Sequence, residues 1–466
     1  MAINAKIVYR QHLRDRQQRH SGALRACAGA QLGEAHEPDM SKSDDKKMQS
    51  SRRNFLVGAG GVLAATGIAA QSPATASPEV GITPKPSTLE ADIEPFFGTH
   101  QGGIATAAQT QTYFAVFDLQ TEKVEEVKAL LRRWTDLAAK LSTGVINLAQ
   151  SPEILKTDSG EALGLEPSRL TLTFGFGKGL FEKGGKDRYG LKAKMPEALI
   201  DLPYFNGDQL IDGHSGGDLS IQACANNPQV AFHAVRQLVN QAHGVASIRW
   251  AQSGFSAQYG EKAPRNLMGF KDGTINPGTP LDYDRFVWVG NEGPAWMNGG
   301  SYVVARVVRI ALEHWDRMDI DYQEQTVGRR KFSGAPLSGK KESDPLDLDA
   351  VDKDGNPLIP AMAHARIASA AMNDGTQILR RGYSYNNGAT FTAERWPPWH
   401  QGIEYDAGSL FICYQRDPRT GFVKLFDKLS KLDAMNQFTT HIGSGLFACP
   451  PGVTAGGFIG DRLFES

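Results

Sequence analysis

The sequence is poor in cysteine. Its 466 residues include four, Cys27, Cys224, Cys413 and Cys449, and no C-x-x-C pair occurs. This absence excludes a disulfide-stapled miniprotein, a zinc ribbon, a thioredoxin-type redox motif and the covalent attachment site of a c-type haem.

The sequence also lacks an excess of charge of either sign. Lys and Arg number 50, Asp and Glu number 51, and the formal net charge is −1. A generic nucleic-acid binder with a dominating basic surface is thereby excluded. The apolar share of 41% and the charged share of 22% are ordinary for a globular protein, which excludes wholesale disorder. The length corresponds to about two to four domains.

The N-terminal region has the layout of an export signal. Arg52 and Arg53 precede an uncharged, Gly- and Ala-rich run from Phe55 to Ala70, and Ala74-Thr75-Ala76 matches a small-residue cleavage site. This order is typical of a twin-arginine signal peptide, so we expect cleavage after Ala76. The run is short for a membrane span of ~20 residues. A buried Gly/Ala helix and an uncleaved anchor are the alternative interpretations.

Removal of residues 1–76 would leave 39 basic and 45 acidic residues, a net charge of −6. An acidic chain of this kind argues against anionic membranes and nucleic acid as partners. The twin-arginine route carries folded proteins, often with a cofactor already inserted, as the family of its substrates implies. We therefore expect the twin-arginine export machinery as a partner, and a periplasmic or extracellular location.

The mature chain contains two successive sets of strand and helix patterns. Period-two or β-rich runs predict strands, and apolar residues at helical spacing predict helices. The first half gives strands at 111–119, 169–176, 219–224 and 248–253 and helices at 123–141 and 229–243. The second half gives strands at 301–310, 377–381 and 408–414 and helices at 312–328 and 421–432.

This order predicts an α+β fold of two ferredoxin-like β-α-β-β-α-β domains with antiparallel sheets, similar to a dimeric α+β barrel. The predicted organisation has a leader over 1–76, a proline-containing linker over 77–95, an N-terminal domain over 96–276 and a C-terminal domain over 277–466. No repeat is visible in the sequence itself, so the duplication is inferred from the order of elements alone.

Two motifs have ordinary interpretations. The glycines of Gly175–Gly179 hint at a nucleotide loop, but the full G-x-G-x-x-G is absent, and a strand-to-helix turn is the better interpretation. The acidic stretch Asp347–Asn356 resembles a calcium loop, yet its first and twelfth positions are Ala350 and Ala361, which have no carboxylate. We expect a solvated insertion there.

Three separate features could carry chemistry. Gly269-Phe270-Lys271-Asp272-Gly273-Thr274 allows close backbone approach to a flat ligand, although alone it also fits an Asp-Gly turn. His364 lies among small residues, which leaves room over the imidazole, but a lone histidine is more often a packed side chain. Arg380 ends an apolar run beside Arg381 and Gly382, and a surface ion pair is its ordinary interpretation.

Together, Gly-x-x-Asp-Gly, a histidine about 90 residues later and an arginine 16 residues beyond it resemble the dye-decolorising peroxidase family. The stretches Ala223–Pro228, Ala231–Leu238 and His314–Arg317 also look like that family. The resemblance covers roughly residues 93–451. With the twin-arginine leader, the sequence looks most like the exported deferrochelatase/peroxidase branch.

The resemblance implies haem b, iron protoporphyrin IX, bound non-covalently. His364 would be the proximal ligand to the iron, Asp272 would transfer a proton on the distal side, and Arg380 would stabilise developing charge. The imidazole needs an acceptor for its other nitrogen, and Asp374 is the nearest candidate in the sequence.

Other contacts to haem are also implied by the resemblance. Gly273, Thr274 and Ile275 would line the haem edge. Strand alternation allows only one of Arg380 and Arg381 to be catalytic, and the family's apolar pair before the arginine selects Arg380. The branch usually has Asn-Pro-Arg where this chain has Ser369-Ala370-Ala371. We still expect this loop to contact haem, but a polar or cationic contact is lost. Arg306 or Arg309 could replace it at the propionates.

The resemblance therefore implies a peroxidase that uses hydrogen peroxide to oxidise an organic or iron reductant, with a link to iron acquisition. A deferrochelatase that releases iron and leaves the porphyrin intact, and a non-catalytic haem carrier, are the alternatives. An iron-permease system is a further partner suggested for this branch, and the family often forms homo-oligomers. Carriage alone needs neither Asp272 nor Arg380.

Overall fold

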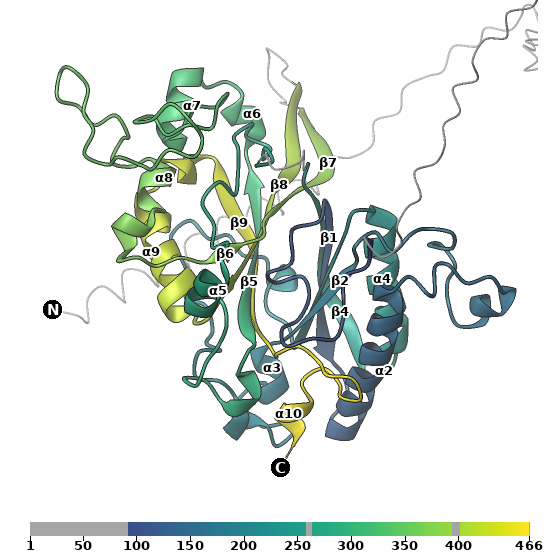
Figure 1. Cartoon of the computed structure of the whole chain (residues 1–466). Coiled ribbons are helices and arrows are strands. Elements are labelled where there is room, and N and C mark those ends of the chain that lie inside the picture. Colours follow the sequence, from purple (N-terminus) through teal and green to yellow (C-terminus); the bar gives the residue numbers. More distant parts are fainter. Residues whose placement is uncertain (1–91, 258–262, 394–400, 466) are drawn as a thin grey trace, which may run out of the picture. The chain divides into compact units, whose positions relative to one another are not determined.

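A computed structural model describes residues 92–257, 263–393 and 401–465 (Figure 1). The predicted leader over 1–76 and residues 77–91 of the predicted linker over 77–95 lie outside these residues. Among the residues described, no helix is both long and apolar enough to cross a membrane.

The first half contains four strands and two long helices in the predicted order β-α-β-β-α-β. The strands pair antiparallel in the order β2-β3-β1-β4. Helix α4 begins where Asn227 caps it by accepting a hydrogen bond from the Gln229 N–H at 2.8 Å. The elements are β1 (Gln111–Leu119), α2 (Val124–Ser142), β2 (Thr171–Phe176), β3 (Leu219–Ala225), α4 (Pro228–Gln241) and β4 (Ala246–Phe255).

The second half repeats the arrangement with shorter helices. Its strands pair in the order β9-β5-β8-β7, and β6 adds two residues beside β8. The elements are α5 (Pro280–Phe286), β5 (Ser301–Ile310), α6 (Leu312–Trp315), α7 (Ile320–Val327), α8 (His364–Ile367), β6 (Leu379–Arg380), β7 (Tyr383–Ala393), β8 (Gln401–Gln415), α9 (Lys424–Leu432) and β9 (Thr439–Cys449).

The prediction of one continuous helix over 312–328 is wrong, because the structure has two separate helices there, α6 and α7. The Asp319 side chain accepts a hydrogen bond from the Tyr322 N–H at 2.8 Å, which starts a new helix after α6. The predicted strand over 377–381 is likewise only the two residues of β6. The turn interpretation of Gly175–Gly179 is confirmed, because β2 ends at Phe176 and the short helix α3 (Lys178–Phe181) follows directly.

The two sheets join at both edges. Phe176 of β2 pairs with Ala448 of β9, and Phe255 of β4 pairs with Ser384 of β7. The eight long strands therefore form a closed, barrel-like ring, and the predicted α+β fold of two ferredoxin-like halves is confirmed. Helices α2 and α4 lie on the outer side of the first sheet, and α8 and α9 lie beside the second (Figure 1).

Three of the four buried hydrophobic clusters in the described residues pack against the two sheets. The first sheet packs against α2 and α4 through residues such as Phe117, Trp134 and Leu238. The interior between the two sheets is filled by a second cluster that includes Tyr385 and Tyr414. On the outer side of the second sheet, residues of β5, β8 and α9 form the third. Because successive side chains of a strand point to opposite faces of the sheet, each strand contributes apolar residues both to the interior and to the helix-covered outer side.

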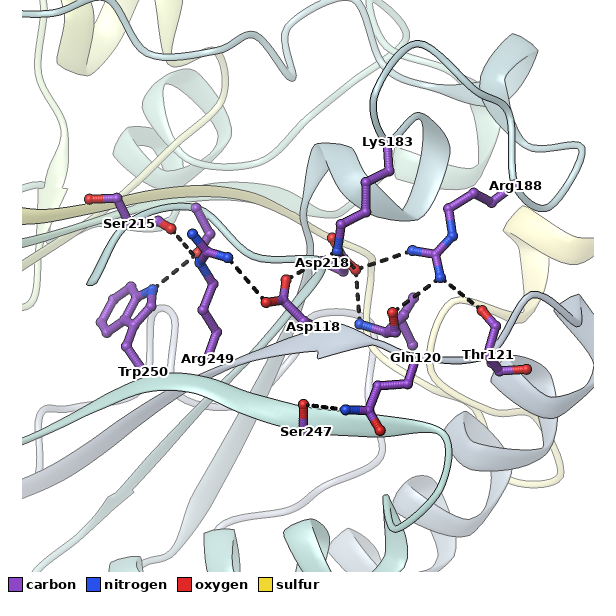
Figure 2. Close-up of polar contacts among 12 residues, drawn as sticks. Asp118, Gln120, Thr121, Lys183, Arg188, Ser215, Asp218, Ser247, Arg249 and Trp250 are labelled. Atoms are coloured by element: carbon purple, nitrogen blue, oxygen red, sulfur yellow. Dashed lines mark hydrogen bonds and ion pairs between the residues drawn. The ribbon is translucent and has the colours of Figure 1, made fainter. Parts of the chain in front are cut away.

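A buried carboxylate fastens the turns at one end of the first sheet. Asp218 accepts a hydrogen bond from the Leu119 N–H at 2.8 Å and pairs with Lys183 at 2.8 Å and Arg188 at 3.5 Å. Figure 2 shows Asp218 between these two cations, beside Asp118 and its partner Arg249. The Asp218 side chain is only 3% exposed, so its charge depends on these partners.

The Asp218→Asn variant is expected to lower the free energy of unfolding by about 2–3 kcal/mol, because Arg188 loses its buried carboxylate and keeps only the exposed Glu122 as an ion-pair partner among the described residues. Urea unfolding of the mature chain measures this. Asp201→Asn is the matched control, since Asp201 is 79% exposed in its pair with Lys178 and should change stability by less than about 1 kcal/mol. Equal losses in the two variants would contradict the assigned role of Asp218.

Candidate functional site

The Gly-x-x-Asp-Gly segment is a loop anchored by its apolar residues. Met268 and Phe270 are buried, the ring of Phe270 meets Trp315 edge-on, and the Trp315 indole N–H donates to the Met268 carbonyl at 3.0 Å. Gly273 has φ +84°, in the left-handed region, and a Cβ there would meet nothing within 4 Å. The backbone thus turns in open space and leaves the Asp272 side chain 49% exposed.

A second layer of contacts holds this loop in place. Lys271 forms an ion pair with Glu342, and the Thr274 hydroxyl donates to the same carboxylate at 3.2 Å. Burial raises the pKa of Glu342, but hydrogen bonds from Lys271 and Thr274 outweigh it, so the pKa lies below its ordinary value. Glu342 was not found from the sequence, because nothing in its local pattern marks a partner 71 residues from Lys271.

Arg380 reaches the same loop from the second sheet. It pairs with Cys413 in the β6–β8 ladder. One guanidinium nitrogen lies 3.3 Å from an Asp272 carboxylate oxygen, and the other donates to the Ile275 carbonyl at 2.7 Å. Arg381 faces the opposite way, as strand alternation predicts, and is buried with its guanidinium on the side chain of Gln109.

Asn276 fixes the backbone of Arg380 from both sides. Its side-chain oxygen accepts a hydrogen bond from the Arg380 N–H at 2.8 Å, and its side-chain N–H donates to the Arg380 carbonyl at 2.9 Å. The paired bonds join the loop to β6 directly. Sequence reasoning missed this contact, because 104 residues separate the two positions.

Asn276→Ala is expected to reduce turnover at this site about tenfold, because the Asp272–Arg380 geometry loses its support. We would measure kcat/KM for peroxide and cofactor content together. Asn298→Ala, which removes an exposed amide that donates to Asn291 at 3.3 Å, is the control. Unchanged kcat/KM in the Asn276 variant would show that β6 holds Arg380 without the clamp.

His364 is the first residue of α8. Its Nδ1 lies 2.5 Å from the Asp433 carboxylate, which sits at the end of α9 with a side chain only 5% exposed. Burial lowers the pKa of His364, but the attraction of Asp433 outweighs it, so the pKa lies above its ordinary value. In the neutral imidazole, the contact with Asp433 places the proton on Nδ1 and leaves the lone pair on Nε2.

Two expectations about partners are wrong. Asp374 does not accept from His364; it is 88% exposed and pairs with Lys424 at 2.9 Å, because it lies in a turn that faces solvent. Arg306 is not available for an anionic ligand, since it is fully buried in an ion pair with Asp208. Arg309 is paired with Glu313 at 2.8 Å and is partly exposed.

The remaining predicted contacts lie close to these groups. Ser369 caps a single helical turn, Ala370–Asn373, that follows α8, and Ala370 and Ala371 are its first residues. Ile275 is 52% exposed beside Gly273 and Thr274. Contact of these residues with haem stays a prediction.

The donor set fits an iron porphyrin. Within the described residues, Nε2 of His364 has no hydrogen-bond partner, and the side chain is 34% exposed. The charge of Arg380 lowers the pKa of His364 and the charge of Asp272 raises it, so both charges act on the imidazole. An accessible imidazole backed by a buried carboxylate, together with an acid and a cation, is what axial ligation of iron next to a proton-transfer site requires.

The same chain matches two family models end to end. Residues 101–256 match the model described as Dyp-type peroxidase, N-terminal, and residues 263–454 match Dyp-type peroxidase, C-terminal. The chain belongs to the Dyp-type peroxidase family. The Gly-x-x-Asp-Gly loop falls within the C-terminal model, and the predicted domain boundary at 276/277 stays a prediction.

Similar proteins of this family extend over nearly the whole chain. A dye-decolorizing peroxidase of Thermobifida fusca is 36% identical, with 91% of this chain and 100% of that protein covered. A deferrochelatase of Yersinia pseudotuberculosis is 34% identical, with 91% and 97% covered. DtpA from Streptomyces lividans has a TM-score of 0.72 at 40% identity, with 81% and 100% covered. This member of the Dyp-type family is an oxidoreductase that consumes a peroxide and a reducing substrate.

Proposed function

We propose that the chain binds haem b non-covalently through His364 and uses it to reduce hydrogen peroxide with electrons from an organic or iron reductant. The observation that carries this proposal is the set of contacts at the site. His364 is held by Asp433, and Asp272 is held by Arg380, within reach of each other's charge. When bound, haem b supplies the redox chemistry.

The side chains supply ligation and proton transfer. His364 presents Nε2 to the iron, while Asp433 keeps the ring oriented. Asp272 removes a proton from one peroxide oxygen and returns it to the departing oxygen, so that one carboxylate serves as base and then as acid. Arg380 stabilises the negative charge on Asp272 and on the departing oxygen, with little reorganisation because the Ile275 carbonyl already holds its guanidinium.

An absorption spectrum of the purified mature protein tests this proposal. We expect a Soret band, and a rapid shift of that band after one equivalent of hydrogen peroxide. A band that only bleaches slowly would indicate haem handling without peroxidase turnover. The absence of a Soret band after reconstitution with haem would overturn the proposed cofactor.

Deferrochelatase activity is the second candidate, and the 34% identical Yersinia protein of that name supports it. The same haem pocket would serve both reactions, and a link to an iron-permease system belongs to this candidate. Incubation with haem, followed by chromatography of the porphyrin and a ferrozine assay for iron, separates the two. Metal-free protoporphyrin IX in equal amount to the released iron supports it, and linear tetrapyrrole products contradict it.

We further propose that the twin-arginine machinery exports the folded chain to the periplasm or beyond. Arg52 and Arg53 precede the uncharged run Phe55–Ala70. The double variant Arg52→Lys/Arg53→Lys is expected to leave nearly all protein unexported in a bacterium with this route. Cell fractionation and N-terminal sequencing measure this, with Ser77 expected as the first mature residue. Processing that is equal in both proteins would contradict the proposal.

A further inference from the structure

A buried histidine on α4 faces two carboxylates that have no part in the peroxidase site. His233 is 1% exposed. Its Nε2 lies 3.2 Å from an Asp158 oxygen and its Nδ1 lies 3.3 Å from a Glu161 oxygen, and the Asp158 side chain is only 4% exposed. One potential ligand atom from each residue lies within 4.8 Å of the others. The cluster joins the loop after Lys156 to the helix layer of the first sheet.

The hydrogen-bond geometry of this cluster is incomplete. Although the distances are short, neither ring nitrogen of His233 has a hydrogen-bond partner among the described residues. Oε1 of Glu161 accepts no hydrogen bond from them either, although the Arg236 guanidinium lies 3.2 Å from it. A buried polar group without a partner is costly, so such a group calls for a ligand. A protonated imidazole would need two N–H groups pointing at oxygens, and this arrangement provides neither.

The other contacts leave the charge uncompensated. The Gly160 N–H donates to Asp158 at 2.7 Å, the Ser159 hydroxyl binds Glu161, and Arg236 lies 3.2 Å from Glu161. With a neutral imidazole, two carboxylates face one cation, and Arg236 is 47% exposed. A divalent cation would compensate this negative charge and accept the lone pair of one ring nitrogen, which leaves the other nitrogen as an N–H beside the second carboxylate.

We propose that His233, Asp158 and Glu161 bind a divalent first-row metal ion, with Zn²⁺ as the expected ion. One imidazole nitrogen and two carboxylate oxygens are suitable ligands for Zn²⁺, which then takes a fourth ligand such as water. Mg²⁺ and Ca²⁺ prefer oxygen ligands throughout, so the imidazole selects against them. The ion would fasten the loop to α4 and stabilise the folded state by binding it alone.

Metal analysis of the tag-free, haem-loaded mature chain tests this site. The protein is equilibrated with Zn²⁺ and the free ion is removed. Inductively coupled plasma mass spectrometry is then expected to give one zinc per chain, with haem iron as the internal reference. Asp158→Asn and His233→Ala should each lower the zinc content at least tenfold. His243→Ala, which removes an exposed histidine just after α4, should leave it unchanged.

A second readout does not depend on the folding of the His233 variant. Lys156 is 72% exposed directly before the loop, so trypsin can cut there. Zn²⁺ is expected to slow this cleavage about tenfold in the wild type and not in Asp158→Asn, while cleavage at the exposed Lys353 stays constant. Zinc content below a tenth per chain, or equal protection in both proteins, would overturn the proposal and indicate a metal-free ion cluster. Mg²⁺ that protects as well as Zn²⁺ would also overturn it.

Discussion

Asp272→Asn is expected to lower kcat/KM for hydrogen peroxide by about 10²–10⁴-fold, with haem content unchanged. The asparagine keeps the shape of the side chain and its contact with Arg380 at 3.3 Å, but it cannot accept and return a proton. A loss of this size corresponds to about 3–5 kcal/mol in the barrier, since each tenfold change is about 1.4 kcal/mol. Stopped-flow mixing of the variant with peroxide measures it, and the Soret band reports the haem content.

The partner of Asp272 gives an internal check on this result. Arg380→Leu should cost about 10²–10³-fold, as for other removed charge-stabilising donors. Because the two side chains act as one unit, the double variant should be little slower than the slower single variant. Asp284→Asn, a change at an exposed carboxyl on α5, is the control. If Asp272→Asn stays within threefold of the wild type, another group transfers the proton and the assigned role is wrong.

The strands and helices of the first half could be predicted from the sequence because their hydrophobic patterns are local. Strand β1 was predicted with its observed bounds, Gln111–Leu119, and α2 begins and ends within one residue of its prediction. Strands β7 and β9 were missed. A bulge at Asn386–Ala389 interrupts β7, and Gly443 and Gly445 weaken the strand signal of β9. Gly443 is required there by tertiary contact, since a Cβ would lie 2.9 Å from the His214 carbonyl.

In the candidate site, too, some residues could be predicted from the sequence and others could not. Asp272, His364 and Arg380 each stand in a pattern that a sequence displays, and the fold brings Asp272 and Arg380 within 3.3 Å of each other. Their supporting residues do not. Asp433 lies 69 residues from His364, and no local feature distinguishes it from the nearer but exposed Asp374. Supporting contacts depend on how α8 packs against α9, and this packing is set by side chains spread along the whole second half.

The correction from Asp374 to Asp433 leads to the second large effect. Asp433→Asn should leave haem bound but lower peroxide turnover about 10–100-fold, the usual cost of losing an outer-shell partner of a metal ligand. The asparagine oxygen can still accept from Nδ1 of His364, so the ring stays oriented. The negative charge that makes the imidazole a stronger donor is lost.

This loss of charge has a signature that a structural role would not produce. With a weaker axial donor, the haem iron is easier to reduce, so its midpoint potential should rise in Asp433→Asn. Spectroelectrochemistry of the haem-loaded chain measures the potential, and Asp374→Asn, at the exposed carboxyl paired with Lys424, should leave both potential and turnover unchanged. An unchanged potential with slow turnover would mean that Asp433 only positions the ring. A raised midpoint potential in Asp374→Asn, and not in Asp433→Asn, would mean that Asp374 is the partner of His364 after all.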